Sequence, residues 1–587
     1  MPHAFYMSKN YATGRMTGMR ESSLSQEQQK KTAAVKESFA QCGVEPSFRL
    51  REPEEFMLEI EKEAGLRTVI YRPETDSAVP VIVVRSPYAE MEFIQRAKAE
   101  EYAKRGFGYI YQCCRGTGGS EGTWEPNINE RRDGKALLDW VCDQEWVKSV
   151  GFFGSSYLAL TGWVIADIVP EKVKTMYLTH YGTVRHASAY MNGAFRQDVL
   201  TAWTMGNAGI PISADYETSC KFRPQISVDV KLWGRELDWY RQWILNPGRE
   251  DAYWQKGFWR LLREIPKRIS IPLFVGEGWF DHHLASALET WDMLSEECKK
   301  KSTLCIGGWS HSFENRLEGQ TCFHFDADDD RRAFQWFYHI LKKEEEPQGK
   351  ILKYVIGADC WKSMTYGEKE RTVPSRYYLS YSNGQKKLER NSDLKKQREV
   401  SFVYNPGEPV KSAGGEALLG SAQVQGSRLQ PKPDYRSDVL SFLSDELEEP
   451  LEISGQIRVH LSVATSAEDT AFTVKVMEVM PDGKAYNLRT GITTLGYRNG
   501  AGSCLSYRSG SKEKVEIVMW EIAWQLQKGS RIRIDISSSD FPQYNIHSNY
   551  AGLWALQEKT KTAVQTIFVG GESFLEMPTV LRGKEKE

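Results

Sequence analysis

The chain has 587 residues, too many for one hydrophobic core, so roughly two to four folded units are expected. Hydrophobic residues make up 41% and charged residues 26%, as in ordinary globular proteins. The formal net charge of -2 argues against a nucleic-acid binder, because phosphate binding needs a basic surface. No apolar run has the length of a signal peptide or membrane span, and the cysteines form no CxxC pair. We therefore predict a cytoplasmic protein with no membrane partner, no metal and no cofactor.

Residues 1–50 are polar and mixed, and we interpret them as an N-terminal extension with a helix near Ser25–Ala40. Beyond them, short apolar runs rich in β-branched or aromatic residues predict strands at Thr68–Tyr71, Val79–Arg85, Gly108–Cys113, Ser149–Phe153, Lys174–Leu178, Ile271–Val275 and Ser302–Ile306. Helical patterns such as Phe93–Arg105 and Asp133–Cys142 lie between several of them. This alternation predicts an α/β fold with a mostly parallel sheet covered on both faces.

The alternation stops between residues 183 and 269, where amphipathic helices carry many aromatic side chains. We interpret this stretch as a helical cap inserted into an α/β domain made of residues 51–182 and 270–346. After a predicted helix at Arg331–Lys342, strand patterns dominate at Ser375–Leu379, Glu399–Tyr404, Ile453–Ala464, Ala471–Met480, Val515–Glu521 and Ser530–Ser537. Residues 347–587 are therefore predicted to form an all-β sandwich of the jelly-roll type.

The segment Ser149–Trp163 carries the best local signal for chemistry. An apolar strand runs into Gly-Ser-Ser-Tyr and then into a helical pattern, as in a nucleophile elbow with Ser156 at its tip. The usual motif is G-x-S-x-G, and here Leu158 occupies the last position. An ordinary turn with a serine at a helix N-cap is the alternative explanation.

A serine needs an adjacent base, and in this fold class the order along the chain is serine, acid, histidine. Asp281 follows the predicted strand Ile271–Val275, and His311 follows the next one. Because ligands bind at the carboxyl ends of parallel strands, Ser156, Asp281 and His311 are expected to meet there. Asp281 could instead cap a helix, and His311 could be a surface histidine; His282 and His283 are competing bases that suit the order less well.

Several motifs together resemble the cocaine esterase and X-prolyl dipeptidyl-peptidase (CocE/NonD) family of α/β-hydrolases. The resemblance runs from about residue 50 to the C-terminus and rests on the segments Arg85–Tyr88, Arg115–Gly122, Gly154–Ala159, Gly278–Asp281, Gly308–His311, Trp336–Tyr338 and Gly357–Trp361. It implies a helical cap, a C-terminal jelly roll and an oxyanion hole made by the Tyr88 hydroxyl and the backbone N–H of Tyr157. The glycine loop at Arg115–Gly122 lacks a phosphate-binding motif and is interpreted as a tight turn at the sheet edge.

These features predict a serine hydrolase that cleaves an ester, an amide or a short peptide through an acyl-enzyme intermediate. The tryptophan-rich cap favours an esterase for a bulky apolar acyl group, although cap packing also explains those tryptophans. An X-Pro dipeptidyl-peptidase is the alternative, but the sequence reveals no anionic site for a free N-terminus. The residues after Asp281, beginning with His282 and His283, depart from the carboxylates of the family's α-amino-acid ester hydrolases.

Two hypotheses lie outside this class. One is a catalytically silent binding protein that keeps the fold, which the complete triad argues against. The other is a carbohydrate-active protein, which would rest on the C-terminal fold alone. The aromatic-rich elements are compatible with a homo-oligomer, and the resemblance favours one.

Overall fold

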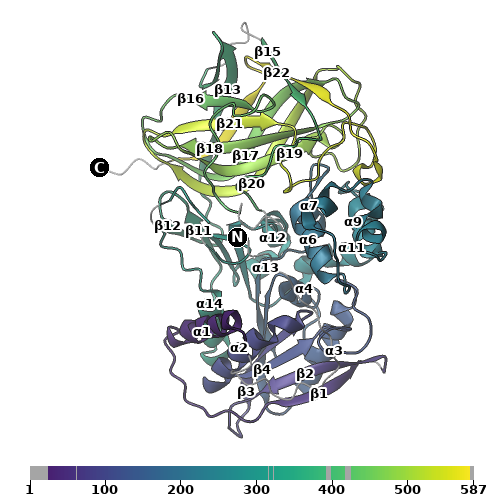
Figure 1. The fold of residues 1–587 in the computed structure, drawn as a ribbon. Coiled ribbons are helices and arrows are strands. Elements are labelled where there is room, and N and C mark those ends of the chain that lie inside the picture. Colours follow the sequence, from purple (N-terminus) through teal and green to yellow (C-terminus); the bar gives the residue numbers. More distant parts are fainter. Residues whose placement is uncertain are drawn as a thin grey trace, which may run out of the picture.

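The computed structural model describes residues 24–60, 62–314, 316–320, 323–391, 398–416 and 425–581. Figure 1 shows a lower body built around one sheet, an upper all-β body, and a group of helices beside them. Of the predicted N-terminal extension, residues 1–23 lie outside the described residues. The predicted helix there is α1 (Gln26–Ala40), which Ser25 begins with a capping box and which packs on α2 (Glu92–Lys104) and α14 (Asp329–Phe337).

The lower body is organised around a ten-stranded sheet in the order β1-β2-β4-β3-β5-β6-β9-β10-β11-β12. Its strands are β1 (Glu54–Ile60), β2 (Ala64–Tyr71), β3 (Val79–Ser86), β4 (Gly108–Cys113), β5 (Val147–Ser155), β6 (Val173–Thr179), β9 (Leu273–Phe280), β10 (Thr303–Ser310), β11 (Lys350–Val355) and β12 (Cys360–Thr365). The central strands from β4 to β11 pair in parallel, and both edges are antiparallel.

Helices cover both faces of this sheet, so β3, β9 and β10 are buried at every position. The covering helices include α2, α3 (Glu130–Asp143), α4 (Tyr157–Trp163), α12 (Leu284–Met293), α13 (Glu296–Lys299) and α14, which continues into the π-helix η5 (Tyr338–Lys342). The seven predicted strands of this part fall in or overlap β2, β3, β4, β5, β6, β9 and β10. The predicted α/β fold class is confirmed.

The first sheet does not end at the predicted domain boundary after residue 346. β11 pairs in parallel with β10, and β12 pairs with β11, so both strands extend the first sheet. Their sequence has the same strand-rich texture as the all-β part, and pairing between distant segments is not visible in local pattern. By strand pairing, the first sheet ends at Thr365.

The segment between β6 and β9 forms the inserted cap. It contains α5 (Arg185–Ala189), α6 (Gln197–Asn207), α7 (Tyr216–Lys221), α8 (Val228–Lys231), α9 (Asp238–Leu245), α10 (Ala252–Gln255), α11 (Gly257–Glu264), the 3₁₀ turns η3 (Gln225–Ser227) and η4 (Ile265–Arg268), and the short pair β7 (Tyr190–Met191) and β8 (Ala194–Phe195). Figure 1 places α6, α7, α9 and α11 beside the lower edge of the all-β body. The Phe195 carbonyl accepts a hydrogen bond from the Asn545 amide at 2.9 Å, so the cap is tied to that body.

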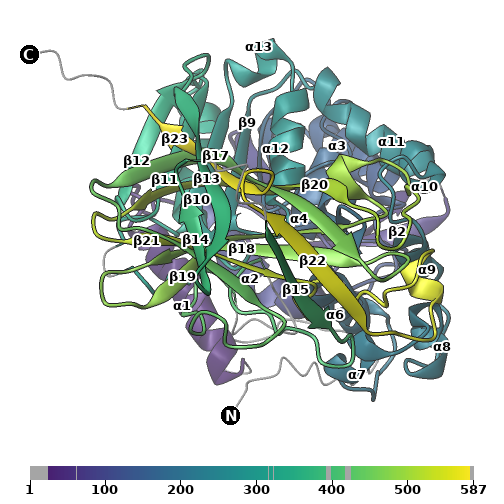
Figure 2. The ribbon, with the colours of Figure 1, turned by 90° about the horizontal axis from the view of Figure 1, so that it is seen from above.

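The C-terminal part is a separate all-β domain. Its strands are β13 (Thr372–Ser382), β14 (Gln385–Glu389), β15 (Arg398–Tyr404), β16 (Leu440–Ser444), β17 (Leu451–Thr465), β18 (Ala471–Val479), β19 (Ala485–Thr494), β20 (Glu513–Leu526), β21 (Arg531–Ser537), β22 (Ala563–Val569) and β23 (Phe574–Val580). The view from above shows these strands crossing over the sheet of the lower body (Figure 2). β22 alternates buried and less buried positions, as expected for a sheet with one face in a core.

Candidate active site

Ser156 lies at a strained turn between β5 and α4. Its backbone has φ 58° and ψ -128°, a conformation that L-residues rarely adopt and that costs about 1–3 kcal/mol. A Cβ on Gly154 would lie 2.2 Å from the Leu158 carbonyl oxygen, so the turn can close only with glycine there. The backbone therefore has the geometry expected of a nucleophile elbow, with Ser156 at the end of the strand.

The leucine that ends this motif does not obstruct the turn. Leu158 is buried among core residues that include Phe153 and Trp309. Its side chain thus contributes to packing, while the close backbone approach is made at Gly154. The departure from G-x-S-x-G is compatible with the elbow for this reason.

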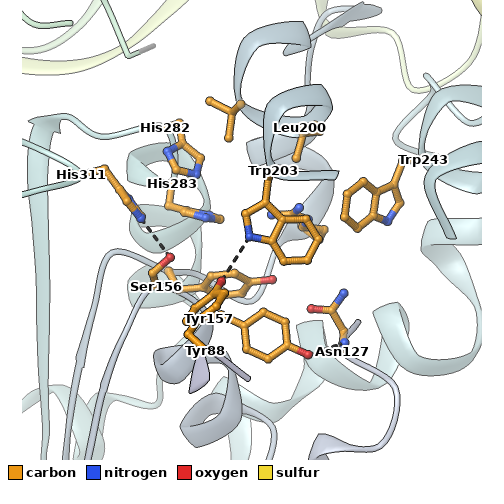
Figure 3. Close-up of a pocket in the computed structure, with 13 residues that line it drawn as sticks. Tyr88, Asn127, Ser156, Tyr157, Leu200, Trp203, Trp243, His282, His283 and His311 are labelled. Carbon is orange, nitrogen blue, oxygen red and sulfur yellow. Dashed lines mark hydrogen bonds between the residues drawn. The ribbon is translucent and has the colours of Figure 1, made fainter. Parts of the chain in front are cut away.

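The structure brings the side chains of Ser156, Asp281 and His311 together, and Figure 3 shows the contact between Ser156 and His311. His311 Nε2 lies 2.9 Å from Ser156 Oγ, and His311 Nδ1 lies 2.7 Å from Asp281 Oδ2. Ser156 follows β5, Asp281 follows β9, and His311 follows β10, so three strand ends at one sheet edge supply them. The imidazole therefore bridges a hydroxyl and a carboxylate at hydrogen-bonding distances on both sides.

Asp281 also forms the turn that precedes α12. Its Oδ1 accepts a hydrogen bond from the His283 backbone N–H at 2.6 Å, while Oδ2 contacts His311. One carboxylate thus makes the contact expected of a helix cap and also the contact with His311 that the predicted triad needs. Of the competing histidines, His283 is bonded elsewhere, with Nδ1 2.8 Å from Ser188 Oγ. His282 Nδ1 lies 3.7 Å from Asp281 Oδ1, beyond hydrogen-bonding distance, whereas His311 contacts both Ser156 and Asp281.

The electrostatics favour an ionised Asp281. Burial opposes its charge, but the neighbouring imidazoles of His311 and His180 hold the pKa of this carboxyl well below its usual range. Burial lowers the pKa of His282 and of His283 well below the usual histidine value, which keeps both rings neutral. Burial, followed by the charge of Asp281, raises the pKa of Glu277 well above the ordinary glutamate value.

His180 is a site neighbour that the sequence analysis missed. It directly follows β6, is fully buried with φ 56°, and its Nδ1 lies 3.7 Å from Asp281 Oδ2. Burial lowers its pKa to about 3. The strand-end rule that identified Asp281 and His311 would have identified it, because the predicted strand Lys174–Leu178 ends two residues before it.

His180, Asp281 and His311 also lie close enough to raise the question of a metal site, since their ligand atoms are within 4.8 Å of one another. Both ring nitrogens of His311 already have protein partners, Asp281 on one side and Ser156 on the other. A metal ligand must offer a free lone pair. The arrangement fits a hydrogen-bonded triad better than a metal site.

The two predicted oxyanion donors lie beside Ser156. Tyr157 is the first residue of α4, so its backbone N–H needs no partner inside the helix. The Tyr88 hydroxyl oxygen accepts a hydrogen bond from Trp203 Nε1 at 3.2 Å, which leaves its own O–H able to donate (Figure 3). Burial raises the pKa of Tyr88 above the ordinary tyrosine value, so the phenol keeps its proton.

A pocket opens at this edge between the sheet and the cap. Trp203 and Trp243 from the cap line it together with Tyr88, Ser156 and His311. Trp233, Trp254 and Trp259 of the cap are buried in packing. Cap packing therefore accounts for several of these tryptophans, while Trp203 and Trp243 also line the pocket.

The glycine loop at 115–122 has a structural role. Arg115 makes two hydrogen bonds to Asp133, and the Glu121 amide donates to the Gly65 carbonyl at 2.9 Å. Ser120 Oγ accepts from the Arg67 amide at 2.9 Å. These contacts fasten the turn to β2, as the sequence predicts.

Comparisons with known proteins agree with this geometry. Residues 63–313 match the model of the X-Pro dipeptidyl-peptidase (S15 family), and residues 341–575 match the model of the X-Pro dipeptidyl-peptidase C-terminal non-catalytic domain. The chain belongs to this family of serine hydrolases. It is 27% identical to cocaine esterase from Rhodococcus sp. over 563 residues, which covers 88% of this chain and 97% of the relative. A putative serine esterase from Mycobacterium bovis is 22% identical over 77% of this chain and 81% of its own length.

Solved structures share the fold of this family member. An α-amino acid ester hydrolase superposes with a TM-score of 0.77 at 20% identity, covering 90% of this chain and 96% of its own. An aminopeptidase from a marine sediment Thaumarchaeota archaeon gives a TM-score of 0.75 at 19% identity, with the same coverage. No helix in the described part of the chain is both long and apolar enough to cross a membrane.

Proposed function

We propose that Ser156 is the nucleophile of this serine hydrolase, His311 its general base and Asp281 the residue that orients the base. The single observation that carries the proposal is the continuous path from Ser156 Oγ through the His311 ring to Asp281, with contacts of 2.9 and 2.7 Å. Asp281 favours the tautomer in which Nδ1 carries the proton and Nε2 can accept one. The strained elbow holds the hydroxyl at the mouth of the pocket.

The reaction is acyl transfer to water. His311 Nε2 takes the proton of Ser156 as Oγ bonds to the carbonyl carbon of the substrate, and the carbonyl oxygen becomes an oxyanion. The Tyr88 hydroxyl and the Tyr157 amide donate hydrogen bonds to that oxygen. Protonated His311 gives its proton to the leaving alcohol or amine as the bond to the carbon breaks. Water then repeats the steps and releases the acid from Ser156.

An ester, or an amide of similar shape, is the substrate class that the pocket supports best. The aromatic wall of Trp203 and Trp243 suits an apolar group next to the reacting carbonyl. The similarity to cocaine esterase at 27% identity supports the same choice. X-Pro dipeptidyl-peptidase activity is the second candidate, favoured by the family models. It needs an anion for the ammonium of a peptide N-terminus, and no carboxylate is among the described residues that line the pocket.

A fluorophosphonate probe tests the nucleophile. We expect the wild-type chain to be labelled at Ser156 and the Ser156→Ala variant to remain unlabelled. Ser155→Ala is the matched control, because Ser155 is the adjacent serine at the end of β5, and it should keep the label. Labelling at another serine would contradict the assignment of Ser156. No labelling of a folded wild-type chain would support the catalytically silent alternative.

A substrate panel separates the two enzyme candidates. Nitrophenyl esters with acyl chains of increasing size are compared with X-Pro chromogenic amides. We expect hydrolysis of the esters with kcat/KM well above that of the amides. Preference for X-Pro amides with a free N-terminus would favour the peptidase instead.

A further inference from the structure

Arg185 is a buried cation in the wall of the proposed substrate pocket. It is the first residue of α5 and lines the pocket that also contains Ser156 and His311. Only 8% of its surface is exposed. Neither the triad nor the oxyanion hole uses this side chain, so its presence there needs its own explanation.

The guanidinium group has an aromatic partner but no acidic one. Its Cζ lies 4.8 Å from the centre of the Trp243 ring, and Tyr181 lies beside it. No carboxylate of the described residues forms an ion pair with Arg185, and its buried Nε has no hydrogen-bond partner among them. A stack on tryptophan fixes the plane of the group, and the Tyr181 hydroxyl offers its N–H groups a neutral partner, so neither neighbour supplies a negative charge.

The other groups that face this part of the pocket do not supply the missing negative charge. His282 and His283 are buried rings kept neutral by desolvation. Asp281 is buried and already bonded to His311 and to the His283 amide. An arginine cannot relieve its burial by losing a proton, because its pKa is too high. A buried guanidinium therefore favours an anionic partner that arrives with the ligand.

From this arrangement we infer that Arg185 binds a carboxylate carried by the substrate. The inference rests on the proposed serine-hydrolase function and narrows its substrates to esters or amides that bear a carboxylate away from the reacting carbonyl. Two parallel N–H donors of the fork would bind the two carboxylate oxygens. The ring of Trp243 holds the fork in place, and Trp203, Val199 and Leu200 would contact the apolar spacer between the two groups.

Pairs of substrates that differ only in this charge test the inference. Monobenzyl adipate is compared with benzyl adipamate, in which a neutral carboxamide replaces the carboxylate. Acetoxybutanoate and acetoxybutanamide form the second pair, with the charge on the alcohol side of the ester. In the wild-type chain we expect kcat/KM for the carboxylate member of at least one pair to exceed that of its amide by about 10–100-fold, the size typical of charge-assisted hydrogen bonds.

Variants assign the preference to one side chain. Arg185→Gln should bring the ratio within each pair close to one, and Arg185→Lys should keep part of it, because the charge remains while the fork is lost. Arg260→Gln is the matched control, since Arg260 is an exposed arginine on helix α11 of the same cap, and it should leave the ratio unchanged. Labelling of Ser156 by a fluorophosphonate in each variant shows that the pocket has folded.

Three results would overturn the inference. One is a wild-type ratio near or below one in both pairs. Another is an Arg185→Gln variant that keeps the wild-type preference. A third is an equal loss for both members of each pair, which means that Arg185 only packs against Trp243. If neither pair is hydrolysed, the same compounds are tested for protection of Ser156 against the fluorophosphonate. The ratio of the protecting concentrations within each pair then replaces the ratio of kcat/KM. Failure of Ser156 to label at all would contradict the proposed function instead.

Discussion

Two clusters of buried ionisable side chains lie on either side of the serine elbow, and they are built in opposite ways. The paired cluster consists of Arg85, Arg115, Glu130 and Asp133, together with the hydroxyl of Tyr157. In it, Glu130 accepts hydrogen bonds from Arg85 and Tyr157 at 2.8 and 2.9 Å, and Asp133 accepts two from Arg115. Every carboxylate oxygen of this cluster has a donor.

The site cluster consists of His180, Glu277, Asp281, His282 and His311. Here Asp281 and His311 are connected, but several neighbours lack partners of good geometry among the described residues. Both ring nitrogens of His180 and both carboxylate oxygens of Glu277 are such groups, and all are fully buried. Unpaired buried groups cost stability, and they tend to occur where chemistry requires them. The contrast is what we expect if the paired cluster supports the turn at Ser156 and the site cluster serves the proposed reaction.

The largest expected effect belongs to the connected pair of the site cluster. Asp281→Asn should lower kcat by about 10⁴-fold, because the amide stabilises the wrong tautomer of His311. Steady-state hydrolysis of a nitrophenyl ester measures it. Asp292→Asn is the control and should keep activity, because Asp292 lies on helix α12, just after Asp281 in the chain, and does not line the pocket. A loss of less than tenfold in Asp281→Asn would remove this residue from the triad.

In the paired cluster the effect should fall on stability. Glu130→Gln leaves the buried Arg85 without its nearest counter-charge. We therefore expect the free energy of the first unfolding transition to fall by about 3–5 kcal/mol. Urea unfolding followed by tryptophan fluorescence measures it. The exposed Glu125 precedes the same helix, so Glu125→Gln should change stability little. Equal effects of the two variants would show that pairing in this cluster is unimportant for stability.

The unpaired histidine predicts a dependence of stability on pH. His180 has a pKa of about 3 in the folded chain, compared with an ordinary value of 6.5. The contribution of this neutral ring to the free energy of unfolding is therefore fully present above pH 6.5 and is lost as the pH falls toward 3. Over this interval, the free energy of unfolding of the wild-type chain should therefore fall more steeply than that of His180→Asn, by up to about 1.4 kcal/mol per pH unit. Unfolding curves at pH 7 and pH 5 measure the difference.

The smallest effect is expected at Glu277. Because its pKa is raised, the folded chain favours the protonated, neutral form, and Glu277→Gln should lower the unfolding free energy by less than about 1 kcal/mol. The same unfolding assay compares it directly with Glu130→Gln. A loss as large as that of Glu130→Gln would mean that Glu277 is ionised and has a partner, which would remove the contrast between the clusters.

The sequence was informative where local pattern and chain order carry the signal. Apolar runs ending in turn residues located the strands. The rule that polar groups gather at parallel strand ends predicted that Ser156, Asp281 and His311 meet. The same rule applied to the strand before the cap would have included His180. Glu277 gave no such signal, since a glutamate inside an apolar strand is indistinguishable from an exposed edge position until the sheet order is known.

Sequence alone determined the alternation of strands and helices, the interrupting cap, the all-β C-terminal part and the order of the three proposed catalytic residues, because each depends on neighbours along the chain. The tertiary structure decided that β11 and β12 complete the first sheet, that Trp203 bonds the Tyr88 hydroxyl, and that Arg185 faces the pocket without an acidic partner. These facts depend on contacts between residues far apart in the chain. Such contacts are set by the packing of whole elements, which no local pattern encodes.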